Sequence, residues 1–168
     1  MIITVDPELC SGCRICEAVC SFSRRNSIKP SASNIKILNH WVAGESLPVI
    51  CLNCPDPPCV DACPIGTLYV DNGIVKLNRD TCAGCGFCVE ACPYHAITIR
   101  EGKASKCDLC GGNPLCVRYC PTGALKYVEP EFKDGLRLDI KKYTEKYNEF
   151  IKNSQYGKIL KYQTVKLT

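Results

Sequence analysis

Cysteine thiols are the groups in this chain most able to do chemistry, because a thiolate binds metal ions and forms disulfides. The chain has 16 cysteines among its 168 residues. They fall into four groups of four, and no cysteine lies outside a group. In chain order the groups are Cys10, Cys13, Cys16, Cys20; Cys51, Cys54, Cys59, Cys63; Cys82, Cys85, Cys88, Cys92; and Cys107, Cys110, Cys116, Cys120. One pattern repeated four times predicts a repeated binding site.

The spacing within the groups favours iron–sulfur clusters. The first and third groups follow C-x2-C-x2-C-x3-C, and the other two lengthen only the middle spacing, to four and five residues. Three closely spaced thiolates suit three corners of a four-iron, four-sulfide cube, and the fourth cysteine of such a run serves the other cluster of a pair. A proline follows the last cysteine of three groups, at Pro64, Pro93 and Pro121, whereas the first group has Ser21.

Zinc and disulfides are the alternatives to iron and sulfide. Zinc favours paired C-x2-C knuckles joined by a longer loop, and the second and fourth groups taken alone fit that pattern. A zinc-based structural or binding module therefore remains an alternative. Disulfides are disfavoured because we expect a cytoplasmic chain: its start has no basic and apolar leader, and no apolar stretch approaches the roughly 18 residues of a membrane span.

Charge and motif content exclude several functions. The formal net charge is +4, and residues 131–168 supply all of it, with nine basic against five acidic residues. The basic residues form no stripe interleaved with aromatics, so no nucleic-acid partner is expected. No phosphate-binding glycine-rich loop occurs. Closing four cubes needs all sixteen thiolates and leaves no iron open to a substrate, so we assign no catalytic residue and expect no enzyme.

The segments between the cysteine groups predict short strands and helices. Two hairpins are indicated by alternating apolar and polar residues around a turn signal: residues 66–78 around Asn72-Gly73 and residues 96–106 around Glu101-Gly102. Further strands are expected within 2–6, 34–41 and 123–129. The residues between the third and fourth cysteine of each group suit a short helix.

The part of the chain after Pro130 has a different pattern. Apolar residues at helical spacing predict an amphipathic helix over 136–153, which ends around Gly157 and is followed by an extended arm over 158–168. This helix either packs on its own cluster domain or, with its basic face and the arm, docks a partner. Among the remaining candidates, structural or surface roles are expected for the single histidines His40 and His95, and packing is expected for Trp41, Phe87 and Tyr94.

The order of the groups resembles a known family. The lengthened middle spacing in the second and fourth groups is similar to that of the four-cluster ferredoxin-like subunits of molybdenum and tungsten oxidoreductases, such as dimethyl sulfoxide reductase and formate dehydrogenase. The stretch "CDLCGGNPLCVRYCPTGAL" looks more like the compact small subunits of tungsten aldehyde:ferredoxin oxidoreductase-type enzymes. A ferredoxin associated with carbon monoxide dehydrogenase would look similar.

The resemblance implies four [4Fe-4S] clusters with crossed ligation, in which each fourth cysteine belongs to a cluster begun elsewhere. The implied ligand sets are Cys10, Cys13, Cys16 with Cys120; Cys107, Cys110, Cys116 with Cys20; Cys51, Cys54, Cys59 with Cys92; and Cys82, Cys85, Cys88 with Cys63. The implied fold class is α+β, with two tandem bacterial-type ferredoxin-like modules and the four cubes in a row.

The implied domains are a polyferredoxin domain over 1–130 and a C-terminal helix and tail over 131–168. The outer module comes from 1–20 and 107–130, and the inner module from 51–100. The implied function is electron relay between a large catalytic subunit, of the tungsten or molybdenum pterin type, and a soluble ferredoxin or another redox protein. A free-standing polyferredoxin that shuttles between partners is the alternative.

Overall fold

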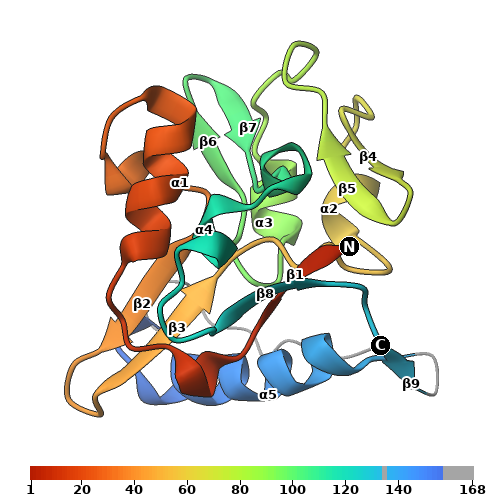
Figure 1. Cartoon of the computed structure of the whole chain (residues 1–168). Helices are drawn as coiled ribbons and strands as arrows, with labels where there is room; N and C mark the ends of the chain where they lie inside the picture. Colours follow the sequence, from red (N-terminus) through yellow and green to blue (C-terminus); the bar gives the residue numbers. More distant parts are fainter. Residues whose placement is uncertain (134–135, 157–168) are drawn as a thin grey trace.

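The computed structural model describes residues 1–133 and 136–156 of the chain. It is a small α+β structure made of short strands and helices (Figure 1). The strands are β1 (Ile2–Val5), β2 (Lys36–His40), β3 (Glu45–Val49), β4 (Leu68–Asp71), β5 (Ile74–Leu77), β6 (Thr98–Arg100), β7 (Lys103–Ser105), β8 (Leu125–Val128), β9 (Phe132–Lys133) and β10 (Leu136–Arg137). The α-helices are α1 (Ile15–Arg25), α2 (Pro58–Asp61), α3 (Phe87–Ala91), α4 (Leu115–Arg118) and α5 (Leu138–Asn153). Three 3-10 helices complete it: η1 (Pro7–Leu9), η2 (Pro30–Ala32) and η3 (Leu109–Gly112).

In the described residues the strands form five antiparallel pairs. Four are hairpins of neighbouring strands, and both hairpins expected from the sequence are among them as β4–β5 and β6–β7. The turn of β4–β5 has φ of 49° at Asn72 and 72° at Gly73, the left-handed values that a two-residue turn of type I′ requires. The fifth pair joins distant segments: β1 pairs with β8, with Ile2 opposite Val128.

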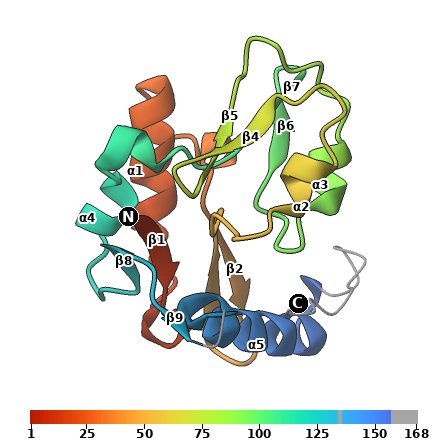
Figure 2. The same cartoon turned by 90° about the vertical axis from the view of Figure 1, so that its right-hand side faces the viewer.

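The elements form two halves above a shared helix (Figure 2). On one side α1 contacts α4, and β1 pairs with β8; on the other, α2 contacts α3 near the hairpins β4–β5 and β6–β7. The hairpin β2–β3, of which only β2 was expected, lies between the halves and α5. One apolar core, which includes the fully buried Ile3, Ile35 and Leu47, runs through both halves.

Helix α1 continues beyond the fourth cysteine of its group, and its length differs from expectation. Proline disfavours helical backbone in the residue before it, and the short helices α2, α3 and α4 all end before a Cys-Pro pair. Ser21 replaces that proline after Cys20, so α1 runs on to Arg25. It ends at Asn26, whose left-handed backbone lets its amide donate to the Phe22 carbonyl at 2.8 Å.

Helix α5 confirms the amphipathic helix expected over 136–153, although the first two residues of that range, Leu136 and Arg137, form β10. Its apolar face packs on its own chain: the rings of Tyr143 and Tyr147 lie 5.6 and 5.5 Å from Tyr94, and Tyr143 donates a hydrogen bond to the Pro48 carbonyl at 2.8 Å. The expected end at Gly157 and the arm over 158–168 lie outside the described residues. Within the described part of the chain, no helix has the length and apolar character needed to cross a bilayer.

Candidate iron–sulfur sites

The first and last cysteine groups meet at one recess. Cys10, Cys13 and Cys16, from the loop before α1 and its first turn, line it together with Cys120, which follows α4. The space among these side chains, counted with the solvent open to it, is about 310 Å³. Cys13 is exposed, which places this recess at the surface.

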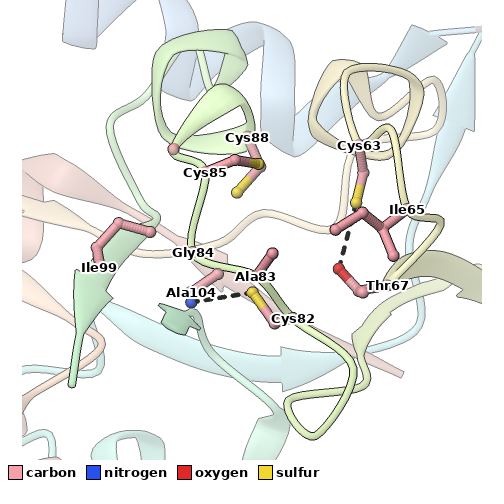
Figure 3. A pocket seen from close by; sticks show the side chains of 11 residues that line it. Cys63, Ile65, Thr67, Cys82, Ala83, Gly84, Cys85, Cys88, Ile99 and Ala104 are labelled. Atoms are coloured by element: carbon pink, nitrogen blue, oxygen red, sulfur yellow. Dashed lines mark hydrogen bonds between the residues drawn. The ribbon is translucent and has the colours of Figure 1, made fainter. Parts of the chain in front are cut away.

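A second recess combines the other two groups in the same way (Figure 3). Cys82, Cys85 and Cys88 line it with Cys63, and Cys85 is exposed. The figure shows Cys63 and Cys82 on separate chain segments that face a common space. Gly84 has φ of 70°, and a Cβ on it would collide with the Gly102 carbonyl oxygen. Only glycine therefore lets this loop lie against the β6–β7 turn.

The remaining eight cysteines lie deeper, and their thiols act on one another. Burial, together with the neighbouring Cys51 and Cys92 thiols, raises the pKa of Cys54 to about 12. Burial likewise raises the pKa of Cys116 well above its usual value. Three thiols, those of Cys107, Cys20 and Cys110, then add to the rise. The Cys59 thiol is influenced by the same three, Cys51, Cys92 and Cys54, so each neighbourhood combines three cysteines of one group with the last cysteine of another.

Backbone amides reach several of the sulfurs. Four amides donate at 3.3–3.4 Å: Asn34 to Cys20, Ala96 to Cys92, Ala104 to Cys82, and Leu109 to Cys107. Such donors stabilise a thiolate, and they tune the reduction potential of a cluster held by it.

Threonine hydroxyls, together with backbone amides, lower the pKa of the fourth cysteine in two groups. The sequence reasoning missed this feature. Burial raises the pKa of Cys63, but the Thr67 hydroxyl at 3.2 Å and nearby backbone amides outweigh it and lower that pKa to about 7. At Cys120, burial is likewise outweighed, by the Leu125 amide and the Thr122 hydroxyl, and the pKa is lowered. A threonine shortly after Cys-Pro, in "CPIGT" and "CPT", is the signal that identifies this feature.

Comparison with protein families decides what this arrangement is. The model of the 4Fe-4S dicluster domain matches residues 42–130, and that of a 4Fe-4S binding domain matches residues 7–23. The chain belongs to the 4Fe-4S dicluster domain family. Because the chain is a member of this family, its cysteine groups are iron–sulfur motifs.

Individual relatives are similar over part of their length. The "Aliphatic sulfonate oxidoreductase, polyferredoxin-like subunit" of Pyrococcus furiosus is 44% identical over 64% of this chain and 64% of its own. The "Thiosulfate reductase electron transfer subunit PhsB" of Salmonella typhi is 36% identical over 61% of this chain and 58% of its own. The chain thus spans less than two thirds of either relative. A solved structure titled "Active site complex BamBC of Benzoyl Coenzyme A reductase in complex with Benzoyl-CoA" is 28% identical over 78% of this chain and 80% of that one, with a TM-score of 0.46. That TM-score is too low to assign a shared fold.

We call the eight cysteines that line neither recess the inner cysteines, and the two sites that they form the inner sites. The residues around them fit a bound cluster. Asn53, 1% exposed between Cys51 and Cys54, has an Nδ2 donor with no acceptor among the described residues. Among the described residues, the buried Nε of Arg24 on α1 also lacks an acceptor, and the Arg24 guanidinium lies near Cys20. Sulfide and thiolate sulfurs accept hydrogen bonds from such donors.

The single histidines and the aromatics Trp41, Phe87 and Tyr94 are not among the residues that line the two recesses. His40 packs edge-on against Phe150 at 6.2 Å, in keeping with a structural role. Tyr94 is buried against α5, which confirms packing. The expectation of packing is wrong for Trp41 and Phe87, which are 78% and 54% exposed. Trp41 follows β2 in its hairpin turn, and Phe87 begins the short helix α3, so neither has a facing element to cover it.

Proposed function

We propose that the chain is a non-catalytic electron-transfer subunit that holds four [4Fe-4S] clusters by crossed ligation. The observation that carries the proposal is that each recess at the surface is lined by three cysteines of one group and the last cysteine of another. The proposed ligand sets are Cys10, Cys13, Cys16, Cys120; Cys107, Cys110, Cys116, Cys20; Cys51, Cys54, Cys59, Cys92; and Cys82, Cys85, Cys88, Cys63. A bound cluster of this type supplies a one-electron redox centre.

The protein's own residues prepare these centres. The thiolates hold the iron, while amides such as that of Ala104 and the hydroxyl of Thr67 donate to their sulfurs. Burial of Cys107 and Cys92 keeps water from the inner sites, and low solvent exposure is one of the factors that set cluster potentials.

We propose that the four sites follow one another in a row. Burial raises the pKa of Cys116, and Cys16 of the neighbouring recess adds to that rise. Burial likewise raises the pKa of Cys107, and Cys51 of the other half adds to it. The sites of Cys13 and Cys85, the exposed cysteines, are then the two ends. Electrons would enter at one end and leave at the other.

The names of the relatives support a catalytic partner. One is called a polyferredoxin-like subunit of an oxidoreductase and another an electron transfer subunit of a reductase. We propose that this chain serves a large catalytic subunit of the tungsten or molybdenum pterin type and exchanges electrons with a soluble ferredoxin. The apolar face of α5 is buried in its own chain, so docking through residues 131–168 would use the exposed face of that helix or the residues beyond it.

Anaerobic purification of the tagged chain from its native host tests this function. We expect a large pterin-containing protein in stoichiometric amount, and reduction of added ferredoxin when the substrate of that protein is supplied. A loaded chain that purifies alone and exchanges electrons with several unrelated partners would favour the free-standing polyferredoxin. Tightly held zinc without sulfide would instead show a zinc module.

A further inference from the structure

Lys106 places a buried ammonium group between the two halves of the molecule. Lys106 follows β7, directly precedes Cys107, and is only 4% exposed. Its Nζ donates to the carbonyl of Cys107 at 2.6 Å and to the carbonyl of Val75 on β5. The Val75 amide in turn donates to Asn53 Oδ1 at 3.1 Å, between Cys51 and Cys54 in sequence.

Within residues 1–133 and 136–156, no carboxylate forms an ion pair with Lys106. Arg137, equally buried at 4%, is paired with Asp139 at 2.6 Å. Among the residues that the structure describes, no acidic side chain forms such a pair with Lys106. An uncompensated buried charge is strongly destabilising, so a different anion must lie close to this ammonium.

The cysteines of both inner sites are the nearby source of negative charge. Lys106 directly precedes Cys107, and its Nζ donates to the Cys107 carbonyl at 2.6 Å. The Val75 carbonyl accepts from the same Nζ, and the Val75 amide donates to Asn53 in the loop that carries Cys51 and Cys54. The ammonium therefore lies beside ligand loops of both inner sites.

We propose that Lys106 is the shared counter-charge of the two inner clusters and raises the reduction potentials of both, a role that rests on the proposed function. A cluster held by four thiolates is anionic, and its charge becomes more negative by one unit when it gains an electron from its neighbour in the row. Lys106 makes and breaks no bond in this step and takes up no proton. Its fixed positive charge favours the reduced form in a medium of low dielectric constant.

The consequence is a relay whose middle accepts electrons readily. Two other cations lie near these sites, but Arg24 is paired with Asp108 and Arg137 with Asp139. The unpaired charge of Lys106 makes entry of an electron into the middle of the row more favourable from either end. Lys106 is thus a positioning residue for charge: it acts through the clusters and touches no substrate.

The test replaces Lys106 in the complete chain with a neutral side chain of similar length. Lys106→Met removes the charge and both hydrogen bonds, and Lys106→Gln removes the charge but keeps a donor. Lys126→Gln on β8 is the matched control, since Lys126 is exposed and solvent screens its charge. Each protein is loaded anaerobically, its iron and sulfide are counted, and its clusters are titrated with a reductant while electron paramagnetic resonance is recorded.

We expect full iron content in both Lys106 variants, with two of the four centres shifted to lower potential and the other two unchanged. Single cysteine variants at Cys54 and Cys110 identify the shifted centres as the inner pair. Unchanged potentials in a fully loaded variant, or shifts confined to the end clusters, would overturn the proposal. So would failure of both variants to load, which would make Lys106 an assembly residue. Fewer than four clusters in the unsubstituted chain would instead contradict the proposed function.

Discussion

Cys120, from the last cysteine group, lines the same recess as Cys10, from the first. The pairing of β1 with β8 brings these two segments together, since Val5 is opposite Leu125 and the Asp6 amide donates to the Ala124 carbonyl at 2.8 Å. A site of this kind forms only when both ends of the cluster region are in place. Folding of the chain and completion of the sites that combine its first and last cysteine groups are therefore coupled.

Substitution of Cys120 tests the crossing directly. We expect Cys120→Ala to lose or degrade the cluster of Cys10, Cys13 and Cys16, with a loss of up to four irons, while the cluster beside it is retained. Cys20→Ala should do the converse and damage the cluster of the fourth group. Iron content and the resonance spectra of the reduced proteins distinguish the two variants. Loss of the fourth-group cluster in Cys120→Ala would contradict crossed ligation.

The close approach at Gly84 predicts a difference between two glycines. Gly84 and Gly73 have φ of 70° and 72°, so alanine is strained at both, but only at Gly84 would the new Cβ meet backbone, that of Gly102. We expect Gly84→Ala to lower the free energy of unfolding by about 1–3 kcal/mol more than Gly73→Ala, the range for an overpacked site. Thermal unfolding of the loaded proteins measures this, and equal losses would refute the contact.

Helix α5 should contribute to the stability of the cluster domain. Phe150 is 1% exposed on its apolar face, and truncation of such a side chain to alanine costs about 3–5 kcal/mol. Lys141→Ala, at an exposed position of the same helix, should change stability by less than about 0.5 kcal/mol. Anaerobic denaturant unfolding compares the two. A negligible effect of Phe150→Ala would mean that α5 is not part of this fold.

The hydrogen bond from Thr67 predicts a pH dependence. Hydrogen bonds lower the folded-state pKa of Cys63 to about 7, below the roughly 8.5 of an unfolded thiol. The resulting stability is fully present above the unfolded value and is lost as the pH falls through about 7. Thr67→Val removes the hydroxyl and should raise the pH at which acid releases iron from the site that includes Cys63.

Thr81→Val is the control for that pH experiment, because Thr81 is exposed near the same site and its hydroxyl bonds only the Asn78 carbonyl at 3.4 Å. Anaerobic iron release is followed across the pH range for both variants. An unchanged or lower release pH in Thr67→Val would show that the hydroxyl does not hold the thiolate.

The sequence was sufficient for the local features and insufficient for the long-range ones. Turn signals at Asn72-Gly73 and Glu101-Gly102 predicted both hairpins, because two-residue turns depend on local backbone preferences. The strand β3 was missed, since Pro48 within it opposes a strand assignment in an isolated segment. The pairing of β1 with β8 depends on contacts across the whole cluster region, and no local pattern encodes it.

The site shows the same division. Spacing predicted all sixteen cysteines as ligands, because the shape of a cube restricts how its ligands are arranged along a chain. The surrounding groups that adjust charge were not identified: Thr67, Thr122, Asn53 and Lys106 come from loops whose relation to the sulfurs appears only after folding. In the sequence nothing distinguishes Lys106 from a surface lysine, and the structure shows that it is buried.

Anaerobic analysis of iron, acid-labile sulfide and zinc per chain, combined with Mössbauer spectroscopy, tests the central claim most directly. Sixteen cysteines at four per cluster predict sixteen irons and sixteen sulfides, all in [4Fe-4S] clusters, and no stoichiometric zinc. Eight irons per chain in a fully loaded preparation, or zinc in place of iron and sulfide, would contradict the four-cluster relay.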